Sequence, residues 1–152
     1  QGVPLEEAET LENIIFGLPI SNADELIDQK VFMDRTGLTS EETEKLERSG
    51  LLIPFSRKKG RKLFDHDDVA MGKSVFKQLF QFQVPLQDMQ FYLTLGRQIT
   101  EKELQLRKKI IQGMTVKDNA KVTVDLTNGA ILSRSYFLKR LFQAALQKKT
   151  ER

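Results

Sequence analysis

The chain has 152 residues, of which 39% are hydrophobic and 30% charged, with a formal net charge of +3 and no cysteine. This length suits one ordinary domain, or a small domain with a helical extension, and excludes two full-size domains. The sequence has no run near the roughly 18 apolar residues of a membrane span, no signal-peptide pattern and no possible disulfide framework. These properties favour a cytoplasmic protein without a membrane partner.

The charges are unevenly distributed along the chain. Residues 1–47 hold twelve acidic and three basic side chains, a net charge of −9, so the remaining residues carry +12. Such asymmetry indicates a surface that binds a polyanion, or two regions that attract each other within a chain or a dimer. Charge alone leaves both interpretations open.

Residues 1–20 predict a short amphipathic helix that begins near Pro4 and stops at Gly17 and Pro19. Its apolar stripe comprises Leu5, Ala8, Leu11, Ile14 and Ile15. The acidic outer face is interpreted as ordinary solvation.

Two further helices follow across a tight turn. Asn22 is placed to cap a turn with Glu25 three residues on, and residues 28–36 then predict a helix that ends at Gly37. Thr39 and Glu42 form a capping box for a second helix over residues 40–49, before Gly50. This arrangement is typical of a helix-turn-helix.

Apolar residues 51–55 and Leu63-Phe64 flank a basic, glycine-containing stretch, which predicts a β-hairpin with Pro54 on an edge strand. The basic hairpin cluster comprises Arg57, Lys58, Lys59, Arg61 and Lys62. Cations on a glycine loop suit phosphate contacts, although a solvated hairpin tip is the alternative.

Further helices are predicted toward the C-terminus. Asp65 and Asp68 cap a core helix whose buried stripe comprises Val69, Phe76, Leu79 and Phe80. A helix from Pro85 to Gly96 and a capped helix from Thr100 to about residue 112, ended by Gly113, come next. Residues 121–127 alternate at period two and predict a short strand, and residues 130–148 predict a long amphipathic helix.

Five fragments in register resemble the DNA-binding domain of the MerR family. They are Thr36-Gly37-Leu38-Thr39, Gly50-Leu51-Leu52-Ile53-Pro54, Gly60-Arg61-Lys62-Leu63-Phe64, Asp68-Val69 and Val84-Pro85-Leu86-Gln87-Asp88-Met89. The resemblance covers about 65 residues. It implies a mostly α fold, a winged helix-turn-helix over residues 21–97 with a short β-hairpin wing, and additional N- and C-terminal helices. The extension over residues 98–152 is then expected to serve dimerisation or packing.

The predicted reading helix departs from the family pattern, because Glu44 stands where the family has arginine. In the wing, Lys62 and Phe64 stand where the family has arginine and tyrosine, so the cation and the ring are kept while bidentate contacts and the hydroxyl are lost. The reading helix carries four glutamates against Lys45 and Arg48, a net charge of −2 that opposes entry between two rows of phosphates. Thr43, Lys45 and Arg48 are the candidate base-contacting residues of this helix.

Other candidate sites have simpler interpretations. His66 lies among Asp65, Asp67 and Asp68, but helix capping accounts for two of these carboxylates, so no metal site is expected. Six aromatic residues could line an effector pocket, yet their helical spacing favours core packing. They are Phe76, Phe80, Phe82, Phe91, Tyr92 and Phe142. No catalytic grouping or cofactor motif is present, so the chain is interpreted as a non-enzyme without a cofactor.

Two functions remain as hypotheses. The first is a homodimeric, sequence-specific regulator that binds double-stranded DNA mainly through its basic wing. The second is a protein-interaction module whose acidic helix face, Glu41 to Glu47, binds a protein partner, because a fold does not fix a function.

Overall fold

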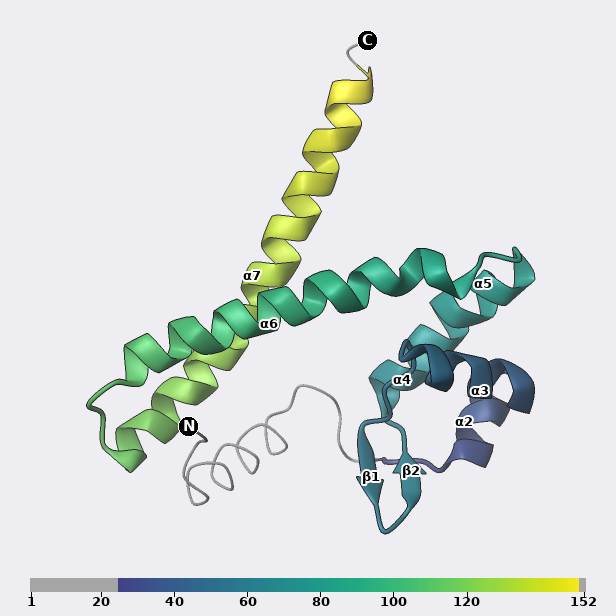
Figure 1. Cartoon of the computed structure of the whole chain (residues 1–152), viewed down its shortest axis with the longest axis horizontal. Coiled ribbons are helices and arrows are strands. Elements are labelled where there is room, and N and C mark those ends of the chain that lie inside the picture. The colour runs from purple at the N-terminus through teal and green to yellow at the C-terminus, as the bar shows by residue number, and fades with distance from the viewer. Residues whose placement is uncertain (1–24, 151–152) are drawn as a thin grey trace. The chain divides into compact units, whose positions relative to one another are not determined.

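A computed structural model describes residues 25–150 of the chain, and it is mostly helical with one small antiparallel hairpin (Figure 1). This confirms the expected α-rich class with a β-hairpin. The elements are α2 (Gln29–Thr36), α3 (Ser40–Ser49), β1 (Ser56–Lys58), β2 (Arg61–Leu63), α4 (His66–Met71), η1 (Gly72–Phe76), α5 (Lys77–Gln81), η2 (Leu86–Met89), α6 (Gln90–Ile111) and α7 (Val116–Thr150). The predicted helix over residues 1–20, and the cap at Asn22, lie outside the described residues.

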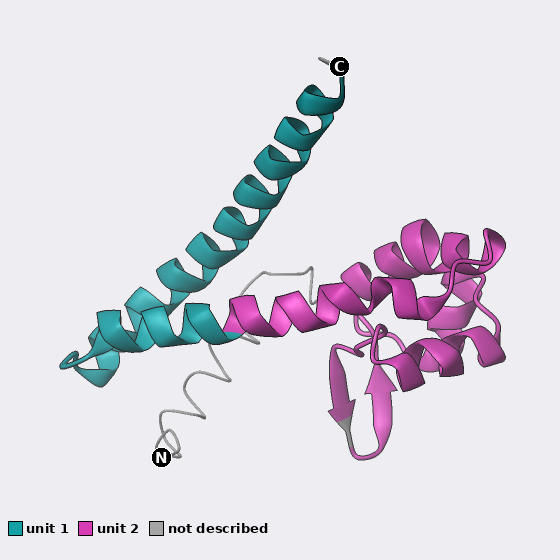
Figure 2. Ribbon diagram, turned by 45° about the horizontal axis from the view of Figure 1, so that its top comes forward, with its two compact units in different colours: residues 1–18, 101–152 teal, residues 19–100 magenta. Residues whose placement is uncertain are grey.

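The chain forms two compact units, which Figure 2 colours separately. The described part of one unit runs from residue 25 to residue 100, and that of the other from residue 101 to residue 150. The first holds the buried apolar core and the hairpin, whereas the described part of the second comprises the end of α6 and the whole of α7. No helix of the described chain combines the length and the apolar character that crossing a membrane requires.

Side-chain caps and glycines set the limits of α2 and α3; the glycine ends and the capping box of α3 were predicted, whereas the cap at Asp28 was not. The Asp28 carboxylate accepts a hydrogen bond from the Val31 amide (2.9 Å), and the predicted box of Thr39 and Glu42 is formed in both directions. Each helix ends at a glycine with a left-handed backbone, Gly37 at φ 74° and Gly50 at φ 78°, which other residues adopt with strain. Two short helices joined by a tight turn are the result.

The hairpin lies further along the chain than predicted, because its strands form within the basic stretch itself. Its register pairs Ser56 with Leu63, and the turn is Lys59-Gly60, with φ angles of 50° and 74°. Positive φ at both central positions matches the twist of a two-residue hairpin turn. Residues 51–55 form the connection after α3, since the Leu51 and Leu52 amides both bind the Leu46 carbonyl and are unavailable to a ladder. The strand bounds predicted from the apolar runs were therefore wrong.

The core of the first unit joins the helices to the base of the hairpin. Its buried apolar residues are Ile27, Phe32, Leu38, Leu46, Leu52, Phe64 and Phe76. The rings of Phe32 and Phe64 stack with centroids 4.3 Å apart, and Phe64 also exchanges two 2.9 Å backbone hydrogen bonds with Ile27. Val69, Leu79 and Phe80 pack against this cluster, which confirms the predicted stripe. The hairpin is thus anchored at its base.

A π-helical turn, η1, connects α4 to α5 within this core. It includes Gly72, which is buried against α2: a Cβ atom there would lie 2.4 Å from Thr36 Cγ2. Phe76, at the end of the turn, is one of the core residues. The π-helical turn therefore places its backbone at Gly72 close to α2 and the ring of Phe76 in the core.

Asp68 closes the capping box of α4 with Asp65, as predicted, and burial raises the pKa of its carboxyl to about 6 despite hydrogen bonds to backbone amides. Because the folded state binds this proton more tightly than the unfolded state, its contribution to stability is full below the unfolded pKa near 4 and is lost as pH rises through about 6. We expect the free energy of unfolding to fall by about 1 kcal/mol across this interval, after allowing for solvent screening. Urea denaturation at a series of pH values measures it.

Asp68→Asn is the matched control, because an amide oxygen can still accept from the Asp65 amide but does not titrate. Glu25, Glu41 and Glu103 have lowered pKa values, caused first by hydrogen bonds to Arg35, Lys45 and Arg134, and give a slope of the opposite sign. The difference between the unfolding free energies of the parent and the variant, measured at each pH, gives the contribution of Asp68 alone. Identical pH profiles for the two proteins would contradict the prediction.

Helices α6 and α7 are longer and fewer than predicted in this region. α6 runs through Gly96 and Thr100 without a break, so the predicted stop and the predicted capping box there were wrong, while Gly113 (φ 81°) follows its end as expected. A single glycine costs a helix about 1 kcal/mol and need not end it. The predicted strand over residues 121–127 was also wrong, since α7 includes it. A lone strand leaves its backbone groups unpaired, whereas a helix pairs them internally.

Part of the expected aromatic core is in fact at the surface. Phe76 is buried and Phe80 half-buried, but Phe82 and Phe142 are 69% and 66% exposed, and Phe91 and Tyr92 are exposed as well. The core-packing interpretation was therefore wrong for these four residues. Helical spacing identifies a shared face, but it does not say whether another element covers that face.

Candidate nucleic-acid interface

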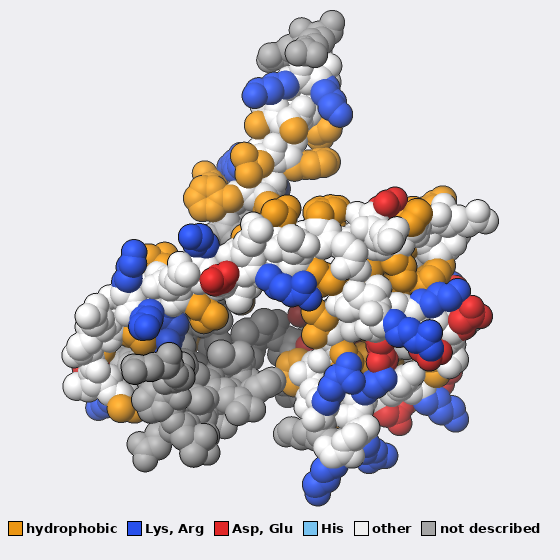
Figure 3. Space-filling model, viewed as in Figure 1, with side chains coloured by type: hydrophobic (Ala, Val, Ile, Leu, Met, Phe, Trp, Pro, Cys, Tyr) orange, Lys and Arg blue, Asp and Glu red, His pale blue; other side chains and the backbone are white. Residues whose placement is uncertain are grey.

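The basic hairpin cluster lies on β1, β2 and the turn between them. Arg57 is paired across the ladder with Lys62, and Lys58 with Arg61, while Lys59 occupies the turn. Figure 3 shows basic side chains gathered at the free end of this hairpin. The two-residue turn thus concentrates five cations on a short, defined backbone.

Three of these cations have no counter-charge among the described residues. Arg57, Lys59 and Arg61 are exposed, and within residues 25–150 none of them forms an ion pair or a side-chain hydrogen bond. Like charges opposite each other on a ladder are destabilising by roughly 0.2–1 kcal/mol. An anion bound at the hairpin would relieve this repulsion, and a phosphate group can accept from a guanidinium in bidentate geometry.

Lys62 has a different role, because its ammonium pairs with the carboxylate of Glu47 on α3. The Glu47 side chain is only 11% exposed, and its other oxygen, Oε1, is buried without a hydrogen-bond partner in the described residues. A buried carboxylate is costly without a cation beside it. The pair therefore fixes the hairpin to α3 and leaves Lys62 committed to that contact.

The predicted base-contacting residues of α3 are placed differently from one another. Thr43 is fully buried and its hydroxyl donates to the Thr39 carbonyl (2.8 Å), so it presents nothing to a ligand. Lys45 and Arg48 are exposed, but Lys45 pairs with Glu41 (2.8 Å) and Arg48 with Glu44. Exposed pairs four residues apart are worth about 0.3–0.5 kcal/mol, so both cations can exchange to another anion.

The four glutamates of α3 all have a cationic partner, which changes the electrostatic character of this helix. Two partners lie within the helix, and two come from outside it: Lys62 for Glu47, and Lys77 at the start of α5 for Glu42 (3.3 Å). Counting Lys62 and Lys77, the net charge of −2 becomes zero. The acidity of α3 is thus largely compensated inside the domain.

Sequence reasoning missed the residues that position α3. Lys77 reaches Glu42 over 35 positions, and the Gln90 side-chain amide donates to the Ser49 carbonyl (2.8 Å) at the end of α3. Separations of this size leave no periodic signal in a sequence. Helical spacing could have shown the burial of Thr43, which lies three residues before the buried Leu46.

The acidic stretch around His66 is used for local structure. Asp65 and Asp68 bind each other's backbone amides, and His66 Nδ1 lies 3.7 Å from an Asp67 oxygen, with both side chains exposed. Within residues 25–150, no group of three or more histidine, cysteine or acidic side chains could hold a metal ion.

Comparisons of the chain with protein-family models, with curated proteins and with solved structures found no match. The resemblance to the MerR family therefore rests on the five sequence fragments. A function has to be argued from the chemistry of the hairpin and of α3.

Proposed function

We propose that the chain is a DNA-binding regulator of MerR type, in which α2 and α3 form the helix-turn-helix and the β1–β2 hairpin is the wing. The observation that carries this proposal is the exposed, uncompensated charge of Arg57, Lys59 and Arg61 on a hairpin fixed to α3 through Lys62 and Glu47. Contacts to phosphate supply most of the non-specific affinity of DNA-binding proteins. The wing therefore provides the affinity, and α3 lies against the duplex beside it.

The pairing of the α3 glutamates supports this reading. An uncompensated acidic helix would be repelled by two rows of phosphates, but here each carboxylate already has a cation. Lys45 and Arg48 can turn from their weak intrahelical pairs to phosphate or to base edges. α3 then acts as a positioning helix with few base contacts, and specificity arises partly from DNA shape.

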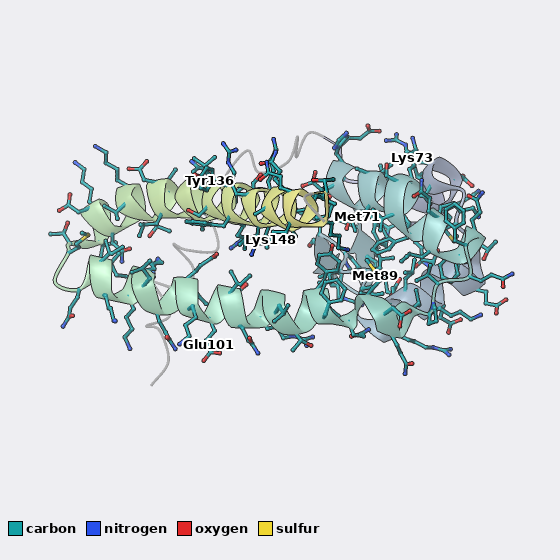
Figure 4. The ribbon with its side chains drawn as sticks, turned by 90° about the horizontal axis from the view of Figure 1, so that it is seen from above. Met71, Lys73, Met89, Glu101, Tyr136 and Lys148 are labelled. Carbon is teal, nitrogen blue, oxygen red and sulfur yellow. The ribbon has the colours of Figure 1, made fainter. Side chains whose placement is uncertain are left out.

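A homodimer places two such wings on a palindromic site. The surface proposed for dimerisation is the apolar stripe on the C-terminal part of α7, where Tyr136 and Lys148 mark the course of the helix (Figure 4). Its exposed residues are Ile131, Leu138, Leu141, Phe142 and Leu146. Contiguous apolar surface of this kind is characteristic of protein interfaces, and a second copy buries it symmetrically.

Duplex binding at increasing salt tests the proposal. We expect the logarithm of the association constant to fall linearly with the logarithm of salt concentration, with a slope of at least about −3 per subunit for three phosphates neutralised. Fluorescence anisotropy with a labelled duplex pool, selected from random sequences, measures this slope. If no duplex binds even at low salt, the chain is not a DNA-binding protein.

The second candidate, a protein partner for the acidic face of α3, is favoured by the exposure of Glu41 and Glu44. Glu44→Arg separates the two readings, because it removes a negative charge, adds a positive one and leaves Arg48 without its partner. For a DNA-binding surface we expect about tenfold tighter duplex binding at low salt, corresponding to about 1.4 kcal/mol. A protein interface would instead lose its partner in a pulldown.

Glu25→Arg is the control for this variant. It makes the same change of charge and also breaks an exposed pair, that with Arg35, but outside α3. If both variants strengthen duplex binding equally, the effect comes from net charge and the proposed placement of α3 is wrong.

A further inference from the structure

The described part of the second unit, residues 101–150, has the end of α6 and all of α7, with little apolar packing between them. Within residues 101–150, Thr123 is the only buried side chain. The described hydrogen bonds that join α6 to α7 come from two arginines: Arg107 donates to Thr123 (3.0 Å) and Asn119 (2.8 Å), and Arg134 forms a bidentate pair with Glu103. A helix pair held through long polar side chains needs a further element to enclose its apolar surface.

That surface lies around the bend between the two helices. The exposed apolar residues there are Leu104, Leu106, Ile110, Met114 and Val116. Covering side chains of this size is favourable because it removes apolar surface from water. A partner that covers the bend must therefore present an apolar stripe.

The same region is strongly basic. Asp118 is the one acidic side chain between residues 107 and 121, against five cations, Arg107, Lys108, Lys109, Lys117 and Lys121. The guanidinium of Arg107 is half-buried, and its described partners are neutral oxygens. A partly buried cation is stabilised when a carboxylate lies nearby. The partner that fits is an apolar stripe edged with acids.

We propose that residues 1–20 of the same chain are this partner and dock as a third helix at the α6–α7 bend. The segment contains four glutamates and no basic residue, and its sequence predicts the stripe Leu5, Ala8, Leu11, Ile14 and Ile15. Thirteen helical residues span about 20 Å, comparable with the length of α6 beyond residue 100. The opposite charges of the two ends of the chain then serve an internal contact, which goes beyond the proposed binding of DNA.

The test uses a tryptophan probe, because the natural chain has no tryptophan. In the full-length chain with Leu11→Trp, the docked indole is expected to emit at a blue-shifted wavelength and to be protected from acrylamide. Adding Lys117→Glu and Lys121→Glu should shift the emission to the red and remove the protection. The matched control, Lys148→Glu with Lys149→Glu, makes the same charge change at the end of α7 and should leave the probe docked.

The chain with Lys117→Glu and Lys121→Glu is called the bend variant, and a charge swap keeps the test informative if this variant unfolds. Glu9→Lys with Glu12→Lys, added to the bend variant, should restore the blue-shifted emission, which an unfolded helix pair would not do. A solvent-exposed indole in the Leu11→Trp chain, or equal responses to the bend and control reversals, would overturn the proposal. If Arg57→Glu with Arg61→Glu alone exposed the indole, the segment would lie on the hairpin. If the emission depended on protein concentration, the segment would lie on a second copy. Either result would also overturn the proposal.

Discussion

Replacing Arg57, Lys59 and Arg61 together by alanine is expected to weaken duplex binding about a hundredfold at low salt and to flatten the salt dependence by about three slope units. The three side chains are exposed and have no counter-charge in the described chain, so their loss removes phosphate contacts without exposing an unpaired acid. The two-residue turn and the core contacts of Phe64 do not depend on them. Fluorescence anisotropy over a range of salt concentrations measures both quantities.

The matched control removes three cations from α7, through Lys139→Ala, Lys148→Ala and Lys149→Ala. It lowers the net charge by the same amount and leaves the hairpin intact. Circular dichroism checks that both triple variants remain folded. Equal losses of affinity in the two variants would show that net charge, and not the hairpin, binds the duplex.

Phe64→Ala is expected to destabilise the first unit by about 3–5 kcal/mol, which is a large share of the 5–15 kcal/mol typical of a whole domain. The ring is fully buried, stacks on Phe32 and lies at the end of the hairpin, where the backbone of the same residue bridges to Ile27. Truncation leaves a cavity between the hairpin and α2 that rigid neighbours cannot fill. Urea denaturation, followed by circular dichroism, measures the change.

Phe82→Ala is the control, since this side chain is 69% exposed. Its free energy of unfolding should change by no more than about 0.5 kcal/mol. Similar values for the two variants would mean that Phe64 does not anchor the hairpin. Duplex binding by Phe64→Ala should fall in parallel with its folded fraction, because the cations remain but their backbone support is lost.

Features encoded within a few residues could be predicted from the sequence. The Thr39 and Glu42 box and the glycines after α2 and α3 each depend on a window of about four positions, and all were placed correctly. The strands were not, because Leu51 and Leu52 bind back to the end of α3, which the apolar pattern does not reveal. The period-two pattern before Asn128 likewise predicted a strand where no partner strand exists among the described residues.

The basic hairpin cluster could be predicted from the sequence, but the different roles of its residues could not. Lys62 differs from Arg61 only because Glu47 happens to lie across from it in the fold. The compensation of the α3 glutamates depends on Lys77, which lies 35 residues from its partner. Contacts of this range arise from packing, so a net charge counted along one helix overestimated its repulsion toward DNA.

The π-helical turn η1 determines how the fold responds to a change in the number of residues in this segment. A π turn holds about one residue more than an α turn, and such turns correspond to single-residue insertions in a helix. Loss of one residue from Gly72–Phe76 could therefore be absorbed as regular α-helix with little rotation of α5. Lys77 would keep its place beside Glu42, and α3 would stay compensated. The same deletion in a regular helix rotates everything after it by about 100°, so this turn is where the segment can change its length without an electrostatic change at α3.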